Sequence, residues 1–189
     1  MTLLTEPPPA APIVDETNWI DAPDGRLYEL IDGTPVEKHV SMLSMWIATR
    51  IAILIGNFVD PPRSLGFVVV EQPVLGIWGR PRHGRRPDVL YISRTKLPTL
   101  PETGDLEVTP DLVVEVVSTH DNVADFEEKL QEYLVAGVRQ IWAVYPRTKS
   151  VRVYMADGSS RLLNITGTLD AADAIPGFTC PVADIFPKI

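Results

Sequence analysis

The sequence predicts one domain of the α/β or α+β class, in which a strand-rich sheet is flanked by two helices. Three observations support this class: short apolar runs bounded by turn residues, two stretches with the 3.6-residue period, and Asp-Gly pairs between apolar runs. The 189 residues fit one domain with a tail and suffice to bury a core. A single cysteine, Cys180, excludes a disulfide framework and a multi-cysteine zinc site.

A proline-rich segment precedes the first predicted element. Residues 1–18 contain Pro7-Pro8-Pro9 and show little apolar periodicity, which is typical of a flexible arm. The N-terminus has acidic residues and no basic region, which argues against a signal peptide, and we find no run of about 18 apolar residues. We therefore expect a cytoplasmic protein without a membrane span, with a single domain over residues 19–189.

The first half of the predicted domain is a β-hairpin followed by a helix. Asp32-Gly33 lies between the apolar runs 27–31 and 34–37, which is a strong hairpin pattern. The first helix is predicted over residues 41–59 and ends before Asp60-Pro61-Pro62. It carries almost no charge, so we expect it to be buried on most sides. Its periodic residues, expected to pack in the core, are Met42, Met45, Trp46, Thr49, Ile53 and Leu54.

Strands and one further helix account for most of the remaining chain. The predicted strands cover residues 67–71, 74–77, 88–92, 112–117, 140–145, 150–155 and 161–165. The last two form a hairpin around Asp157-Gly158. The second helix is predicted over residues 122–136, with Asp121 as its N-cap and Gly137 after its last turn. Residues 112–117 are apolar except for one carboxylate, which predicts a buried central strand.

The charged residue inside that strand is the main indication of a functional site. An unpaired carboxylate buried there would cost several kcal/mol, so Glu115 needs a cation, a metal ion or a proton. Strand alternation places Glu115 on the same face as Val113 and Val117. A purely structural ion pair is the alternative interpretation.

Asp88 and Lys129 complete the candidate site. Asp88 follows Pro87 at the start of a strand, where a carboxylate also commonly caps a turn. Lys129 lies beside the apolar stripe of Phe126 and Tyr133, where a lysine also commonly extends along an apolar edge. Two carboxylates on neighbouring strands can hold Mg²⁺, which polarises a phosphate and activates water, while a lysine offsets the developing charge. The combination indicates metal-dependent phosphodiester hydrolysis.

The charge distribution bears on the partner. A net charge of −8 argues against a protein that coats nucleic acid by bulk electrostatics, but it leaves room for a local basic patch. The predicted loop over residues 79–87 supplies such a patch, with Arg80, Arg82, Arg85 and Arg86. These side chains either meet DNA phosphates or are simply solvated.

Several sequence blocks resemble one protein family. RRPDVLYIS, PDLVVEVVS, the helix with KLQEYLVAGV, and RQIWAVYP resemble the Uma-two family of restriction-endonuclease-like proteins, in the PD-(D/E)xK nuclease superfamily. YELIDG and IPGF extend the resemblance to roughly Leu27–Phe186. The resemblance implies an α/β restriction-endonuclease-like core: a mixed central β-sheet flanked by helices, here with an N-terminal β-hairpin. It also implies dependence on Mg²⁺ or Mn²⁺, and DNA as the substrate.

The resemblance also implies roles for individual residues. Position by position, Asp88 and Glu115 match the motif acids that bind the metal ion, and Lys129 matches a displaced catalytic lysine. Glu29 is a candidate further metal ligand, or else it braces the turn that follows it. Tyr133 is expected to pack on Lys129 and hold it toward the site, or else to belong only to the core.

Four positions depart from the family pattern. Val117 stands where the usual motif lysine would be, Thr119-His120 stands where Pro-Ser is frequent, and Ser44 stands near the place of a helix histidine. Two functions therefore stay open: a Mg²⁺-dependent DNA endonuclease, and a catalytically silent nuclease-fold module that binds nucleic acid or a protein partner. A homodimer through the apolar first helix is compatible with both.

Overall fold

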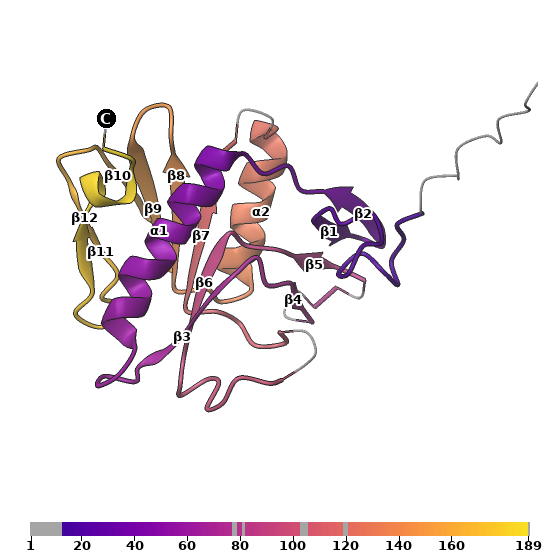
Figure 1. Ribbon diagram of the computed structural model, residues 1–189, viewed down its shortest axis with the longest axis horizontal. Coiled ribbons are helices and arrows are strands. Elements are labelled where there is room, and N and C mark those ends of the chain that lie inside the picture. The colour runs from indigo at the N-terminus through magenta and orange to yellow at the C-terminus, as the bar shows by residue number, and fades with distance from the viewer. Residues whose placement is uncertain (1–12, 77–78, 81, 103–105, 119–120, 189) are drawn as a thin grey trace, which may run out of the picture.

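A six-stranded mixed sheet is the centre of the fold in the computed structural model, which describes residues 13–76, 79–80, 82–102, 106–118 and 121–188 (Figure 1). The strand order is β10-β9-β8-β7-β6-β3. β7 and β8 run parallel, and the other neighbouring pairs run antiparallel. The strands are β3 (Gly66–Val70), β6 (Val89–Ser93), β7 (Leu112–Val116), β8 (Gln140–Tyr145), β9 (Ser150–Met155) and β10 (Ser160–Leu163). The predicted α/β class with a mixed central sheet is confirmed.

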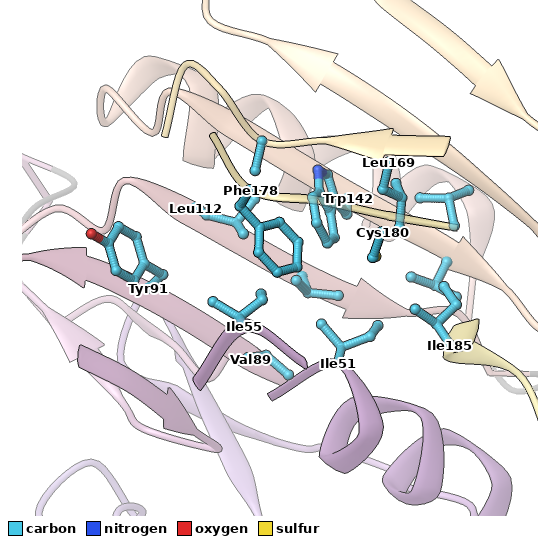
Figure 2. Packing of buried hydrophobic residues seen from close by; sticks show 14 of the residues in the cluster. Ile51, Ile55, Val89, Tyr91, Leu112, Trp142, Leu169, Phe178, Cys180 and Ile185 are labelled. Carbon is cyan, nitrogen blue, oxygen red and sulfur yellow. The ribbon is translucent and has the colours of Figure 1, made fainter. Parts of the chain in front are cut away.

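Two helices cover opposite faces of this sheet. α1 (Met42–Val59) packs on one face, where Figure 2 shows its Ile51 and Ile55 close to Val89 and Leu112 of the sheet. α2 (Val123–Val135) packs on the other face, where its Leu130 and Tyr133 form a smaller cluster with strand residues Val113 and Ile141. Because successive strand residues point to opposite faces, Glu115 lies on the α2 side together with Val113.

Local capping explains where both helices begin. Ser41 and Ser44 form a capping box at the start of α1, in which each hydroxyl oxygen accepts from the other residue's backbone N–H. α2 begins at Asn122, whose side chain accepts from the Ala124 N–H at 2.9 Å. The predicted N-cap, Asp121, accepts instead from the backbone of Ser118. α2 therefore starts one residue later than its predicted cap implies.

The buried face of α1 differs from the predicted one. Its buried residues are Ser44, Ile47, Ala48, Ile51, Ile55 and Val59. Met42, Met45, Trp46 and Ile53, which were expected in the core, are 89, 56, 44 and 48% exposed. That prediction is wrong because a helix that is apolar all round has no polar face to fix its orientation. By length and composition alone, α1 could also cross a membrane, contrary to the sequence expectation, although core helices of soluble proteins share these properties.

A second, four-stranded sheet in the order β2-β1-β5-β4 holds the N-terminal hairpin. β1 (Tyr28–Ile31) and β2 (Thr34–Glu37) pair antiparallel around Asp32-Gly33, as predicted. β4 (Val74–Leu75) is shorter than its prediction, of which residue 77 lies outside the described part. β5 (Gly84–Arg85) forms inside the segment that was expected to be a loop, and it pairs with β1 and β4.

The predicted arm is described only in part. Residues 1–12 lie outside the described residues, and the structure begins at Ile13. Val14 packs against the small cluster formed by Trp19, Tyr28 and Leu30 under the second sheet. The last residues of the predicted arm therefore already belong to a packed unit.

The C-terminal segment adds to the core on the α1 side. β11 (Thr168–Asp170) and β12 (Thr179–Pro181) form a two-stranded sheet, followed by the 3₁₀ helix η1 (Val182–Ile185). Phe178 stacks at a ring distance of 6.2 Å from Trp142 of β8, and Cys180 is buried as a free thiol in the same cluster (Figure 2). The sequence predicts only a closing tail here, so this small sheet is an addition.

Candidate active site

Buried charged side chains meet on the α2 side of the central sheet. Asp88 directly precedes β6, Glu115 lies in β7, Lys129 lies in α2, and Glu29 comes from β1 of the second sheet. The side chains are between 5 and 11% exposed. All four residues line one cavity of about 300 Å³. The structure thus brings together every residue that the sequence singled out as a metal ligand or catalytic group.

Lys129 joins two of these carboxylates. Its Nζ lies 2.8 Å from Oε1 of Glu115 and 2.8 Å from Oε1 of Glu29. The Tyr133 hydroxyl, one helical turn along α2, donates to the same Glu115 oxygen at 2.6 Å. Tyr133 therefore orients the acid that pairs with Lys129, which differs from the expected packing on the lysine itself.

Glu29 is held from three sides. Its Oε1 accepts from the backbone N–H of Arg86 at 3.0 Å in addition to its ion pair with Lys129, and its Oε2 accepts from Arg85 at 3.0 Å. None of these contacts involves the Asp32-Gly33 turn. Glu29 therefore belongs to the charged site and does not brace the Asp32-Gly33 turn.

Asp88 is fixed by the neighbouring strand. Its Oδ2 accepts from the Val116 N–H at 2.5 Å, which ties the start of β6 to the end of β7 beside Glu115. Its Oδ1 lies 2.6 Å from Nζ of Lys38, the residue that follows β2. Lys38 Nζ also lies 2.7 Å from Oε2 of Glu71.

Sequence reasoning missed Lys38 and Glu71. Lys38 stands in a polar stretch, where a lysine is ordinarily solvated, so the sequence holds no signal for its burial. Glu71 follows the apolar strand β3, and its backbone N–H donates to the Asp88 carbonyl. Asp88 was identified as a carboxylate at the start of an apolar strand, and a carboxylate at the end of one could have identified Glu71 in the same way.

Burial and neighbouring charges shift the pKa values of the two central acids in opposite directions. Burial raises the pKa of Glu115 to about 7, with a contribution from the Asp88 charge and against the attraction of Lys129. Burial also acts to raise the pKa of Glu29, but Lys129 and Arg85 outweigh it and lower the pKa to about 2. Glu29 is therefore the ionised partner of Lys129, whereas Glu115 can gain or lose a proton near neutral pH.

Both lysines remain charged. Burial acts to lower the pKa of Lys38, but the carboxylates of Asp88, Glu115 and Glu71 raise it above its ordinary value. The pKa of Lys129 is raised in the same way by Glu115 and Glu29 against the effect of burial. The cavity therefore holds two ammonium groups among its carboxylates.

The donor set fits a divalent cation that keeps part of its water shell. Among the described residues, no group of three or more His, Cys, Asp or Glu side chains is arranged to hold a metal ion. Mg²⁺, however, is commonly bound through one or two carboxylates and several waters, and Asp88 and Glu115 supply two carboxylates on one cavity. The carboxylates of Glu29, Glu71, Asp88 and Glu115 outnumber the cations Lys38, Lys129 and Arg85 that pair with them. A bound cation would relieve this excess, which also contributes to the raised pKa of Glu115.

Two of the four arginines predicted to meet phosphates are buried. Arg85 binds Glu132 of α2, with 2.6 Å between Nε and Oε2, as well as Glu29. Arg86 donates to the backbone carbonyls of Ile20, Tyr28 and Glu71. Because β5 inserts beside β1, both guanidinium groups hold the second sheet against the rest of the molecule, which differs from both expectations for this loop, phosphate contact and solvation.

Arg80 and Arg82 lie nearer the surface, and both form ion pairs. Arg80 donates to Asp32 and to Glu132, with 3.0 Å between its Nη1 and Glu132 Oε1. Arg82 pairs with Glu16. Each of the four arginines therefore has a carboxylate or carbonyl partner within the chain.

The residues that depart from the family pattern lie at or near the cavity where the structure describes them. Val117 continues β7 with a backbone hydrogen bond to Val144, and its side chain supplies no charge. Ser44, near the place of the family histidine, lines the cavity and caps α1. Thr119 and His120 lie outside the described residues.

Comparisons with known proteins found one family and similar solved structures. A family model described as "Uma2: Putative restriction endonuclease" matches residues 15–183. The crystal structure of "a putative nuclease belonging to DUF820" from Anabaena variabilis is similar, with a TM-score of 0.75 and 17% sequence identity over 92% of this chain and 98% of that chain. At this identity the likeness shows a shared fold. No curated protein matches the chain.

Proposed function

Since the chain belongs to the Uma2 family, we propose that it is a divalent-metal-dependent endonuclease that hydrolyses phosphodiester bonds in DNA. Family membership confirms the resemblance seen in the sequence and supports a nuclease-like function. One observation carries the finer proposal: Lys129 Nζ lies 2.8 Å from both Glu29 and Glu115, in a cavity that Asp88 also lines. Two acids and one lysine are the minimal set for metal-assisted attack of water on a phosphate.

Asp88 and Glu115 would hold Mg²⁺ or Mn²⁺. When bound, the metal ion polarises a phosphate oxygen and lowers the pKa of a coordinated water. Both oxygens of Glu29 are already engaged by Lys129, Arg85 and the Arg86 backbone, which favours a role in positioning Lys129 over direct metal contact.

The chain's own groups perform three tasks. Lys129 keeps its proton and places a positive charge where negative charge develops on the phosphate oxygens. Tyr133 fixes the Glu115 carboxylate by its hydrogen bond, so that Lys129 and the metal ligand keep one relative position. The antiparallel and parallel partners of β7 hold Asp88 and Glu115 on adjoining strands, which limits reorganisation during the reaction.

Nicking of supercoiled plasmid with Mg²⁺ or Mn²⁺ tests the proposal. Lys129→Met keeps the apolar stem and removes the charge, so cleavage should fall by about 100-fold or more, the scale of one lost transition-state contact. Mn²⁺ binding should persist, whereas Glu115→Gln should weaken metal binding and cleavage together. Circular dichroism checks that each variant folds, because the loss of Lys129 leaves two buried carboxylates without their partner.

Lys96→Met is the matched control. Lys96 also pairs with a buried carboxylate, with 3.0 Å between Nζ and Asp111 Oδ1, but it does not line the cavity. Its loss leaves Asp111 with its ion pair to Arg139, so it should destabilise the fold less than Lys129→Met does and should not specifically reduce cleavage. If the wild-type protein cleaves no supercoiled, linear or single-stranded DNA with either metal ion, the endonuclease proposal is wrong.

A catalytically silent nuclease-fold module is the second candidate. It is favoured by Val117 in place of the motif lysine, and by further carboxylates that line the cavity and would repel a polyanion: Glu37, Asp121 and Asp125. The same assay separates the two functions. A silent module would bind Mn²⁺ through Asp88 and Glu115 without nicking DNA.

A further inference from the structure

Lys38 holds a position in the acid cluster that the proposed mechanism does not use. Its side chain is 11% exposed and reaches from the end of β2 into the cavity. Nζ lies 2.6 Å from Asp88 Oδ1 and 2.7 Å from Glu71 Oε2, and it donates to the Arg86 carbonyl at 2.7 Å. In each of these three contacts the ammonium group binds an oxygen atom.

This oxygen environment is also the kind that a hard divalent cation selects. Carboxylate and carbonyl oxygens converge on Nζ at the distances of charge-assisted hydrogen bonds. Asp88 Oδ2 is already bound to the Val116 N–H, so Oδ1 is the oxygen of Asp88 that remains for a metal ion, and Lys38 is bound to it. Two cations on one carboxylate oxygen would repel each other strongly in a cavity of this depth.

We propose that Lys38 is a built-in competitor of the divalent metal ion at Asp88, and that metal binding displaces its ammonium group from Asp88 Oδ1. The inference rests on the proposed function, because it takes Asp88 as a metal ligand. Glu71 offers the displaced ammonium a partner, since its side chain is 28% exposed and lies toward the edge of the cluster. Competition from Lys38 thus raises the metal concentration that is needed to occupy Asp88, and below that concentration Asp88 stays paired with Lys38.

Lysine acetylation with and without saturating Mn²⁺ tests the displacement in the wild-type protein. Without metal, Lys38 should react slowly, because its amine is buried and ion-paired. Mn²⁺ should raise the acetylation of Lys38 several-fold, as measured by mass spectrometry of the peptide that contains it. Lys96 is the internal reference, since it lies outside the cavity, and its reactivity should not change.

Glu115→Gln is the matched control for this measurement. It weakens metal binding but leaves the contacts of Lys38 with Asp88, Glu71 and Arg86 in place. At the same Mn²⁺ concentration, the increase in Lys38 acetylation should be lost in this variant.

The Mn²⁺ affinity of Lys38→Met gives an independent test. Removing the competitor should tighten the dissociation constant by about tenfold or more, as expected for the loss of one nearby positive charge. Arg80→Met also removes a positive charge, but one that binds Asp32 and Glu132 and has no contact with Asp88. If Lys38 acts by occupying Asp88 directly, Arg80→Met should change the Mn²⁺ dissociation constant less than about threefold. A comparable change in both variants would mean that Lys38 acts only through the net positive charge of the region.

Unchanged acetylation of Lys38 at saturating Mn²⁺ overturns the inference, and so does an unchanged or weaker affinity in Lys38→Met. If Lys38→Met does not fold, the acetylation of the wild-type protein decides alone. If Mn²⁺ binds and supports cleavage while Lys38 stays protected, the inference fails and the proposed function stands. If neither the wild type nor Lys38→Met binds Mn²⁺, both fail.

Discussion

Glu115 makes the stability of the metal-free protein depend on pH in an uncommon direction. Its pKa is about 7 in the folded protein, against an ordinary value of 4.5, so the folded state holds the proton more tightly than the unfolded state. Its contribution is therefore most favourable below about pH 4.5 and is lost as the pH rises through about 7. We expect the full loss to be on the order of 3 kcal/mol in the free energy of unfolding.

Urea unfolding between pH 5 and 8, in the presence of a chelator, measures this effect. The difference in the free energy of unfolding between the wild type and Glu115→Gln should fall with rising pH. The other ionisable groups beside Glu115 are Asp88, Lys38, Lys129, Glu29 and Tyr133, and burial raises the pKa of Tyr133 well above this pH range. Glu29, with its pKa lowered to about 2, contributes its stabilisation at every pH above about 4.5, so it adds no slope in this range. A pH-independent difference would contradict the raised pKa of Glu115.

The sequence identifies those site residues whose local surroundings are anomalous. Glu115 is conspicuous because a carboxylate inside an apolar strand must have a partner, and Lys129 because it adjoins an apolar stripe. Lys38 and Arg85 stand in polar stretches, where charged residues are expected to be solvated. Arg85 is buried because β5 pairs with β1, and Lys38 is buried because β2 ends beside Asp88. The sequence predicts neither arrangement.

Among the structural elements, β3 offers a sharp test of strand packing. A methyl group at Gly66 would collide with the Ile92 carbonyl and lie 2.7 Å from the Tyr91 ring. Gly66→Ala should therefore lower the free energy of unfolding by about 2–3 kcal/mol, because the backbone pairing of β3 with β6 has to shift.

Gly56→Ala is the matched substitution in α1. The nearest atom to its added methyl group, an Asp60 carboxylate oxygen, lies 3.9 Å away, so nothing needs to move. The variant should gain about 0.5–1 kcal/mol, because alanine favours a helix over glycine. Thermal unfolding of both variants checks the opposite signs. Equal effects would mean that the close approach at Gly66 does not govern the pairing.

Elements with a clear period or turn signature are predicted from the sequence, and the others are not. The hairpins around Asp32-Gly33 and Asp157-Gly158 form as predicted, because such dipeptides specify tight turns. β5 and β12 have two and three residues, which is too short for any periodicity. The orientation of α1 was also beyond prediction, because its outward residues are as apolar as its inward ones.

On the scale of the whole molecule, the two faces of the central sheet serve different purposes. The α1 face carries the large cluster that includes the C-terminal segment, whereas the α2 face carries a small cluster beside the charged cavity. The residues predict a sheet between two helices and the resemblance a mixed one, and strand alternation with helical spacing then places Glu115 and Lys129 toward each other. That the N-terminal hairpin reaches the cavity is predicted only through the family resemblance, which makes Glu29 a candidate ligand, because the contact joins residues far apart along the chain.

The way in which the second sheet is attached has a consequence for subglobal opening. Its own small cluster is separate from the main core, and its links to α2 include the ion pairs of Glu29 with Lys129 and of Arg85 with Glu132. Because Val74 of β4 packs with Leu90 and Ile92 of β6, we expect only the β1–β2 hairpin to open while β7 and β8 stay intact, and each such opening takes Glu29 away from Lys129. Amide hydrogen exchange should show β1 and β2 opening at lower free energy than β7 and β8. The contact between Glu29 and Lys129 would then be lost before the central strands open.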